Sequence, residues 1–173
     1  TQFPEATIQA TEIVQHLNKR GVSTYSGLIY DAEIRRQVEE HDADLLIALG
    51  GDGTMLRAGN LCAPFNLPIL GINMGRFGFL TEIRKDQWQN NFDRLFEGDY
   101  WIEHRMMLHA EHWRENSILG NWEVLNEIVV SRGQIVRPVH LVTHVNDRYL
   151  TTYVADAVIV STATGSTAYA MAA

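Results

Sequence analysis

The hydrophobic and polar positions of residues 1–99 predict alternating helices and strands. Some segments repeat apolar residues at helical spacing, whereas others are short continuous apolar runs. The run over residues 44–49 ends at Gly50-Gly51-Asp52-Gly53, which is typical of a strand buried on both faces of a parallel sheet. Helices are expected over residues 6–20, 31–41, 54–62 and 86–97, and strands over residues 22–26, 44–49 and 68–72. This alternation indicates an α/β domain with a parallel sheet.

The pattern changes near Glu97-Gly98-Asp99-Tyr100, after which strand-like runs replace the alternation. Asn146-Asp147-Arg148 lies between two of these runs and has the residue types of a hairpin turn. Strands are expected over residues 101–113, 122–131, 135–146, 149–154 and 157–160. We therefore predict a domain boundary near residue 99, with an α/β domain over residues 1–99 and a β-rich domain, incomplete here, over residues 100–173.

Composition and charge disfavour several classes of protein. The 173 residues carry a formal net charge of −7, which argues against nucleic-acid binding, and one cysteine, which rules out an intrachain disulfide. No apolar run approaches the roughly 20 residues that span a bilayer, and the first residues are not a signal peptide. We expect a soluble, cytoplasmic protein without a membrane or nucleic-acid partner. The start without methionine and the end inside a helix-like segment, residues 168–173, suggest a fragment.

The segment Leu49-Gly50-Gly51-Asp52-Gly53-Thr54 carries the clearest candidate chemistry. Glycines let a ligand approach the backbone closely, and backbone amides next to a helix N-terminus bind phosphate. An aspartate among phosphates repels them unless it holds a metal ion or removes a proton, and phosphoryl transfer to a hydroxyl needs such a group. The alternative is a tight turn in which Asp52 caps the following helix. The sequence contains neither the P-loop motif nor the dinucleotide-fold glycine motif.

Three further segments suit a polar ligand, and each also has a simpler explanation. Asn73 to Leu80 follows a predicted strand, and its phenylalanines, Phe79 among them, fit either stacking on a base or a hydrophobic plug. Asn126-Glu127 interrupts a strand run, facing either solvent or a ligand. Ser161 to Thr167 is a run of hydroxyls around one glycine, which suits anion binding or ordinary helix capping. The histidines lack metal-ligand spacing, so no metal ligands are predicted.

Taken in order, these segments resemble those of the NAD kinase family. The matching pieces are Gly50-Gly51-Asp52-Gly53-Thr54, Asn73 to Leu80, Asn126-Glu127, Asp156, and Thr164-Gly165-Ser166-Thr167-Ala168-Tyr169. The first is shared with a wider superfamily of diacylglycerol, sphingosine and phosphofructokinase-like kinases, whereas the full ordered set is much more specific. The resemblance implies an NAD kinase/diacylglycerol kinase-like fold. It also implies phosphoryl transfer from ATP or polyphosphate to the 2′-hydroxyl of the adenosine ribose of NAD, giving NADP.

The resemblance further implies roles for individual residues. Asp52 would be the general base, and Gly51 and Gly53 would shape the phosphate-binding turn. Arg57 and Arg137 match positions of cationic or polar ligand contacts, or are solvated surface charges, and Phe79 is the aromatic candidate. The residues implied to contact or line the dinucleotide site are Asn126, Glu127, Asp156, Thr164, Thr167, Ala168, Tyr169, Ala170, Met171 and Ala172. Mg²⁺ would travel with the phosphates, and a homo-oligomer, dimer or tetramer, is expected as in other members.

The chain also departs from the family pattern. Ala157 stands where glycine is usual, Ala163 where proline is usual, and Val154 where a basic residue is frequent. The change at Val154 alters a potential contact with the dinucleotide phosphates. The family's opening strand is not found before the first helix, in agreement with a fragment. Two other functions stay open. One is a lipid kinase with the same glycine turn, which Asn126-Glu127 and the run from Thr164 to Tyr169 disfavour, and the other is a sensor that binds the dinucleotide without turnover.

Overall fold

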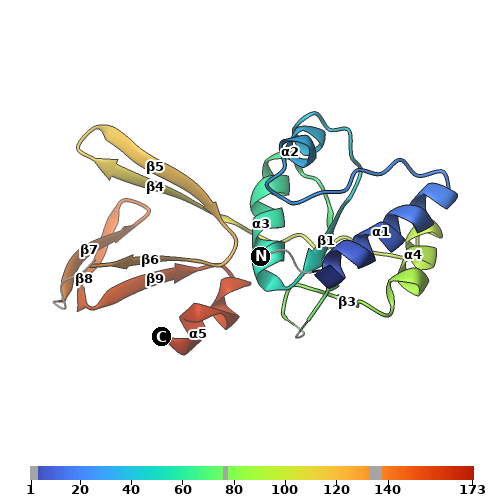
Figure 1. Ribbon diagram of the computed structural model, residues 1–173. Coiled ribbons are helices and arrows are strands. Elements are labelled where there is room, and N and C mark those ends of the chain that lie inside the picture. The colour runs from blue at the N-terminus through green and yellow to red at the C-terminus, as the bar shows by residue number, and fades with distance from the viewer. Residues whose placement is uncertain (1–3, 76–77, 133–137) are drawn as a thin grey trace. The chain divides into compact units, whose positions relative to one another are not determined.

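The computed structural model of the chain describes residues 4–75, 78–132 and 138–173 (Figure 1). The chain divides into two compact units, Thr1–Glu103 and His104–Ala173. The first unit combines a parallel sheet with helices, and the second is built from antiparallel strand pairs. The predicted fold class, an α/β part followed by a β-rich part, is confirmed.

Three parallel strands form the sheet of the first unit, in the order β1 (Leu46–Gly50), β2 (Ile69–Asn73) and β3 (Ile83–Arg84). β1 and β2 are the two predicted apolar runs, and helices cover both of their faces, which explains why they do not alternate between apolar and polar residues. β3 has only two residues, too few to leave a pattern in the sequence. Gly50 pairs with Asn73, so the carboxyl ends of β1 and β2 lie together at one edge of the sheet.

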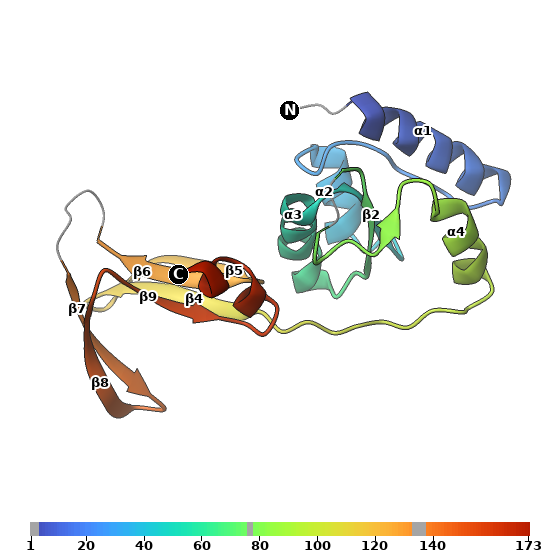
Figure 2. The ribbon, with the colours of Figure 1, turned by 90° about the horizontal axis from the view of Figure 1, so that it is seen from below.

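Helices α1 (Pro4–Lys19) and α4 (Trp88–Phe96) pack on one face of this sheet (Figure 2). Their apolar stripes meet the side chains of β2 and β3, because both helices have apolar residues at helical spacing. The buried cluster on this face consists of Ile13, Leu17, Ile72, Ile83, Trp88 and Phe92. Both helices were expected from the sequence, and the structure confirms them.

Helix α3 (Asp52–Cys62) covers the opposite face and follows β1 directly. Gly71 of β2 gives α3 room, because a Cβ atom at this position would lie 2.7 Å from Sδ of Met55. Cys62 is completely buried at the end of α3, which continues into the short 3-10 helix η1 (Ala63–Phe65). Helix α2 (Ala32–Glu39) contacts α3 and agrees with the predicted polar helix.

The predicted strand over residues 22–26 is wrong, because these residues have no regular secondary structure. The chain leaves α1 through Gly21, which has a φ of +79°, and the N–H group of Val22 donates to the carbonyl of Leu17. Val22 then packs against the apolar core. Residues with a high strand propensity form a strand only where a neighbouring strand pairs with them. The sheet of the described residues in this unit consists of β1, β2 and β3 alone.

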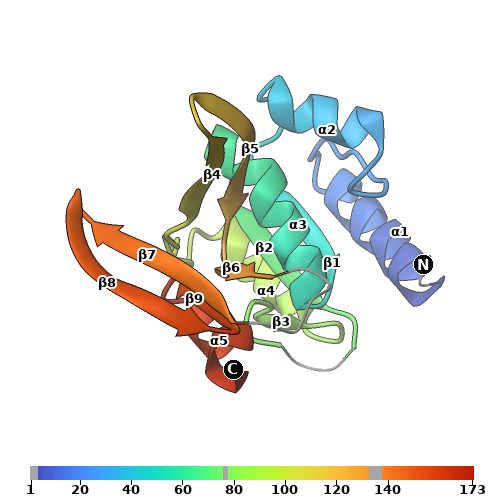
Figure 3. The same ribbon diagram turned by 90° about the vertical axis from the view of Figure 1, so that its left-hand side faces the viewer.

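The described residues of the second unit form three antiparallel pairs of strands (Figure 3). Each pair satisfies the backbone hydrogen bonds of its two strands along one edge. The pairs are β4 (Leu108–Arg114) with β5 (Ser117–Val124), β6 (Glu127–Ser131) with β9 (Ala157–Ser161), and β7 (Val139–Val145) with β8 (Arg148–Ala155). The predicted hairpin turn between β7 and β8 is confirmed: Asn146 and Asp147 have φ of 50° and 62°, as a two-residue turn of type I′ requires.

Two predicted strand boundaries in this unit are wrong. The run over residues 101–113 becomes a strand only at Leu108, because no strand of the described chain pairs with residues 101–107. The run over residues 122–131 is divided between β5 and β6. Leu125 and Asn126 separate the two strands, and their carbonyl groups accept hydrogen bonds from Thr162 instead of from a strand partner.

Among the residues that the structure describes, no helix combines the length and the apolar character needed to cross a membrane. The longest helix, α1, has 16 residues and carries polar and charged side chains.

Candidate functional site

The glycine turn joins the end of β1 to the start of α3. Gly50 is the last residue of β1, Gly51 is the N-cap residue of α3, and Asp52 is the first helical residue. The N–H groups of Thr54 and Met55 donate to the carbonyl of Gly51 and close the first helical turn. A Cβ atom at Gly50 would lie 2.2 Å from Oγ1 of Thr54, so only glycine fits this approach. The predicted arrangement of strand, glycine turn and helix is therefore present.

Gly51, and not Asp52, is the N-cap residue of α3, and both carboxylate oxygens of Asp52 bind elsewhere, so the simpler interpretation of this aspartate is wrong. Its carboxylate turns instead toward residues 78–80, which follow β2. Oδ2 accepts the N–H group of Phe79 and Oδ1 accepts the N–H group of Leu80, each at 3.0 Å. The structure thus brings two of the predicted segments into direct contact through one carboxylate, and the sequence gives no sign of this contact.

Gly78 makes this contact possible. A Cβ atom at position 78 would lie 2.1 Å from Oδ1 of Asp52 and within 2.6 Å of the rest of its carboxyl group. Phe79 follows with its side chain 76% exposed, so it does not serve as a hydrophobic plug, whereas Leu80 is buried. Phe77, the other phenylalanine of the predicted segment, lies outside the described residues.

Asn73 and Thr81 are both buried and stand at the two ends of this loop. Nδ2 of Asn73 donates to Oγ1 of Thr81 at 2.8 Å, and Oδ1 of Asn73 accepts the N–H group of Gly75 at 2.7 Å. Asn73 is the last residue of β2, so the sheet fixes the position of this amide. We refer to the described residues of this segment, 73–75 and 78–81, as the Asp52 loop.

In the second unit, Thr162 connects two further predicted segments. Its hydroxyl donates to the carbonyl of Leu125 at 2.5 Å and accepts the N–H group of Gly165 at 2.9 Å. Its own N–H group donates to the carbonyl of Asn126 at 2.9 Å. Thr162 is buried. Thr162 belongs to the predicted run of hydroxyls, but the sequence does not single it out, because nothing in the run indicates which hydroxyl points inward.

Gly165 lies directly against the backbone of Asn126. A Cβ atom at position 165 would lie 2.0 Å from the carbonyl oxygen of Asn126. Asn126 and Glu127 are both partly buried, which argues against the interpretation that this pair simply faces solvent. Oε2 of Glu127 is buried and has no hydrogen-bond partner within the described part of the chain. A buried carboxylate oxygen without a donor is a group that a ligand can satisfy.

The other predicted residues that the structure describes in this unit are Asp156, Thr164 and residues 167–172. Asp156 is exposed between β8 and β9. Thr164 is the N-cap residue of the 3-10 helix η2 (Gly165–Thr167), and its hydroxyl accepts a hydrogen bond from Arg105 at 3.3 Å. Residues 168–172 continue into the short helix α5 (Tyr169–Ala172). Among residues 167–172, the exposed ones are Thr167, Tyr169, Met171 and Ala172, and the partly buried ones are Ala168 and Ala170.

The two predicted arginines differ in what the structure shows of them. Arg57 is exposed on α3 and folds back onto the turn, where its Nη1 donates to the carbonyl of Gly53 at 2.9 Å. This places a guanidinium group beside the glycine turn. Arg137 lies outside the described residues.

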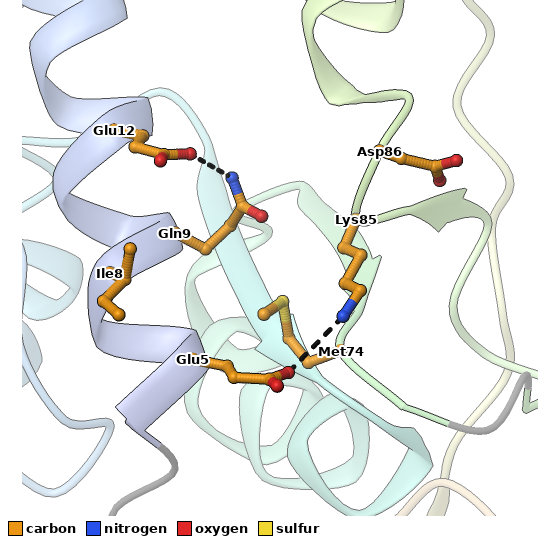
Figure 4. Close-up of a pocket in the computed structure, with 7 residues that line it drawn as sticks. All are labelled: Glu5, Ile8, Gln9, Glu12, Met74, Lys85 and Asp86. Carbon is orange, nitrogen blue, oxygen red and sulfur yellow. Dashed lines mark hydrogen bonds and ion pairs between the residues drawn. The ribbon is translucent and has the colours of Figure 1, made fainter.

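A shallow groove of about 320 Å³ lies between α1 and the residues Met74, Lys85 and Asp86 (Figure 4). Nζ of Lys85 reaches Oε2 of Glu5 across it at 3.4 Å, and Nε2 of Gln9 donates to Glu12 at 3.0 Å. The residues that line it are Glu5, Ile8, Gln9, Glu12, Met74, Lys85 and Asp86. Met74 belongs to the predicted segment Asn73 to Leu80, whereas the other lining residues lie outside the predicted segments.

Two observations define the class of protein. A parallel sheet ends at a glycine turn that holds a carboxylate, and a β-rich part follows that joins Asn126-Glu127 to a hydroxyl-rich loop. This is the fold of NAD kinase-like phosphotransferases. Residues 4–100 match the ATP-NAD kinase N-terminal domain, and residues 125–173 match the ATP-NAD kinase C-terminal domain. The chain therefore belongs to the NAD kinase family.

Individual relatives agree with this assignment. The chain is 43% identical over 162 residues to an NAD kinase of Chloroflexus aggregans, covering 94% of this chain and 58% of the relative. It is 48% identical over 131 residues to an NAD kinase of Caldanaerobacter subterraneus, covering 76% of this chain and 46% of the relative. The crystal structure of an NAD kinase from Archaeoglobus fulgidus in complex with ATP is similar, with a TM-score of 0.71 and 26% identity, covering 94% of this chain and 60% of that one. The chain spans about half the length of the curated relatives that it matches.

Proposed function

We propose that the protein phosphorylates the 2′-hydroxyl of the adenosine ribose of NAD and thereby forms NADP, with ATP or polyphosphate as the phosphoryl donor. The observation that carries this proposal is the placement of Asp52. Its carboxylate lies in the first turn of a helix, beside three glycines, and two backbone N–H groups hold it in place. A fixed carboxylate beside a phosphate-binding turn is what transfer of a phosphoryl group to a hydroxyl requires.

In this reaction Asp52 is the general base. Each of its oxygens accepts one backbone N–H group, which leaves further lone pairs on each oxygen for a substrate hydroxyl. The proton of the 2′-hydroxyl passes to the carboxylate as the ribose oxygen forms its bond to the transferred phosphorus, and the bond from that phosphorus to the donor's leaving oxygen breaks. Gly51 and Gly53 offer their backbone to the phosphates, and Arg57 adds a positive charge near the same turn.

The dinucleotide is proposed to bind the polar residues of the β-rich part. Oε2 of Glu127 supports this role, because it is a buried acceptor that lacks a donor among the described side chains and backbone groups. Phe79 supplies an exposed aromatic ring for stacking on a base. The other residues assigned to dinucleotide binding are Asn126, Arg137, Asp156, Thr164, Thr167, Ala168, Tyr169, Ala170, Met171 and Ala172.

We propose that Mg²⁺ enters with the phosphates of the donor. The described residues contain no group of three or more His, Cys, Asp or Glu side chains that could hold a metal ion, so phosphate oxygens would supply the ligands. When bound, the ion would neutralise phosphate charge.

We further propose a cytoplasmic homo-oligomer, a dimer or tetramer, with domains at residues 1–99 and 100–173. Among the described residues, each strand of the β-rich part is paired along one edge only, which supports self-association.

The direct test is product analysis with the full-length protein. Incubation with NAD, Mg²⁺ and either ATP or polyphosphate should yield NADP, detected by mass spectrometry, and the two donors are compared in parallel. A parallel reaction with diacylglycerol or sphingosine as acceptor should yield no phosphorylated lipid. Binding of NAD without any NADP would favour a sensor and contradict the proposal, and phosphorylated lipid would favour a lipid kinase.

Gly78→Ala is predicted to lower turnover far more than stability. The added methyl group would lie 2.1 Å from Oδ1 of Asp52, and the carboxylate, as the end of a side chain, would move away from its two N–H donors. We expect kcat for NADP formation to fall by roughly tenfold or more, with a loss of no more than about 2 kcal/mol in the free energy of unfolding.

Gly75→Ala is the matched control for this prediction. A Cβ atom at Gly75 has no neighbour within 4 Å, although the residue lies in the same loop. Steady-state kinetics and urea unfolding of both variants separate the two effects. Equal turnover of Gly78→Ala and Gly75→Ala would show that the approach of the loop to Asp52 is unimportant.

A further inference from the structure

A buried side-chain hydrogen bond joins the two ends of the Asp52 loop. Asn73 and Thr81 are each 3% exposed, and the 2.8 Å bond between Nδ2 and Oγ1 joins positions eight residues apart. Oδ1 of the same amide accepts the N–H group of Gly75 at 2.7 Å, so both ends of the Asn73 side chain act within this loop. Buried polar groups are retained where their hydrogen bonds are satisfied, and losing one partner is costly.

This hydrogen bond lies next in sequence to the two residues that donate to Asp52. Leu80, which precedes Thr81, donates its N–H group to Oδ1, and Phe79 donates to Oδ2. A carboxylate with one fixed donor on each oxygen has its plane determined by those donors. Asn73 is the last residue of β2 and pairs with Gly50 at the end of β1. The hydrogen bond from Asn73 to Thr81 therefore ties the segment that carries the two N–H donors to the same sheet that carries the glycine turn.

We infer that Asn73 and Thr81 are positioning residues: their hydrogen bond holds the N–H groups of Phe79 and Leu80 against the carboxylate of Asp52 and thereby orients this group for the transfer. The inference rests on the proposed function for its catalytic consequence. The competing explanation is that burial of the Leu80 side chain alone holds the loop, in which case the hydroxyl of Thr81 only fills space.

Three variants of the full-length protein separate these explanations. Thr81→Val removes the acceptor while keeping the size of the side chain, and Thr81→Ser restores the hydroxyl without the methyl group. Cys62→Ala is the control for general destabilisation, because Cys62 is completely buried in α3, the helix that carries Asp52, and lies ten residues beyond it. Two measurements are made on each variant: steady-state kinetics of NADP formation, and hydrogen exchange of the Phe79 and Leu80 amides relative to those of β1.

We expect Thr81→Val to lower kcat by roughly tenfold or more, with KM for NAD changed by less than about threefold, because misplacement of a catalytic group affects turnover more than binding. Exchange of the Phe79 and Leu80 amides should accelerate by roughly tenfold, while that of β1 stays unchanged. Thr81→Ser should restore both quantities to within about threefold of the wild type, and Cys62→Ala should leave both unchanged.

The inference is overturned if Thr81→Val keeps the exchange rates of Phe79 and Leu80, or if Thr81→Ser behaves like Thr81→Val. It is equally overturned if Cys62→Ala accelerates exchange at these two amides as much as Thr81→Val does. Failure of the proposed function looks different, because the wild type itself would then form no NADP. In that case the exchange measurements alone decide whether the Asn73–Thr81 bond holds the donors of Asp52.

Discussion

Asp52→Asn is expected to lower kcat for NADP formation by about 10²- to 10⁴-fold, the range that loss of a general base typically causes. The substitution removes the group that accepts the proton of the ribose hydroxyl while it keeps the size and shape of the side chain. NAD binding should persist, because the residues assigned to the dinucleotide lie mainly in the β-rich part. Steady-state kinetics and isothermal titration with NAD measure the two quantities separately.

The structure adds a second consequence of this substitution. Both oxygens of Asp52 accept backbone N–H groups at 3.0 Å, so an amide at this position would turn its own N–H₂ group toward one of these donors. The Asp52 loop should therefore loosen as well, and hydrogen exchange at either Phe79 or Leu80 should accelerate. Asp93→Asn is the control, because Asp93 pairs with Arg20 on the surface of the same unit and should tolerate the change. Unchanged turnover of Asp52→Asn would remove Asp52 from the role of base.

Gly165→Ala is expected to have the largest effect on stability, at about 3 kcal/mol, near the upper end of the usual cost of overpacking. The added methyl group would lie 2.0 Å from the carbonyl oxygen of Asn126 and 2.3 Å from its carbonyl carbon. These are backbone atoms that cannot rotate away, unlike the carboxylate that faces Gly78. The hydrogen bonds of Thr162 to Leu125, Asn126 and Gly165 should therefore break together.

Hydrogen exchange of β6 and β9 measures this loss, because the affected segments adjoin these two strands. Ser166→Ala is the matched control. Ser166 is the next residue, its side chain is exposed, and its hydroxyl donates only to the carbonyl of Ala163 at 2.7 Å. The control should lose less than about 1 kcal/mol. Protection of β6 and β9 that is equal in Gly165→Ala and wild type would contradict the close contact between these segments.

The fold could be predicted where burial decides the pattern. β1 and the first four residues of β2 carry no polar side chain because helices cover both faces, and α1 and α4 show apolar residues at helical spacing because each has one buried side. The secondary structure could not be predicted where the pairing of strands decides whether a segment becomes a strand. Residues 22–26 and 101–107 contain strand-favouring side chains, yet no described strand pairs with them. Propensity alone cannot reveal whether a partner strand lies alongside.

The candidate site could be predicted as a set of segments but not as a set of contacts. The glycine turn, Asn126-Glu127 and the hydroxyl run stand out by composition. The bonds from Asp52 to Phe79 and Leu80 join residues 27 and 28 positions apart, and that from Thr162 to Leu125 spans 37 positions. Such long-range pairs leave no local periodicity. Gly78 and Gly165 were visible as glycines in loops, but the atoms that exclude a side chain from each position come from distant segments.

The burial of Cys62 makes this residue a reporter of opening in the helix that carries Asp52. It is the single cysteine of the sequence, and burial raises the pKa of its thiol to about 11. At neutral pH the folded chain therefore contains almost no reactive thiolate. A thiol reagent should modify Cys62 only as fast as local opening exposes its thiol, so its labelling rate in the presence and absence of nucleotides would show whether ligands restrain that opening.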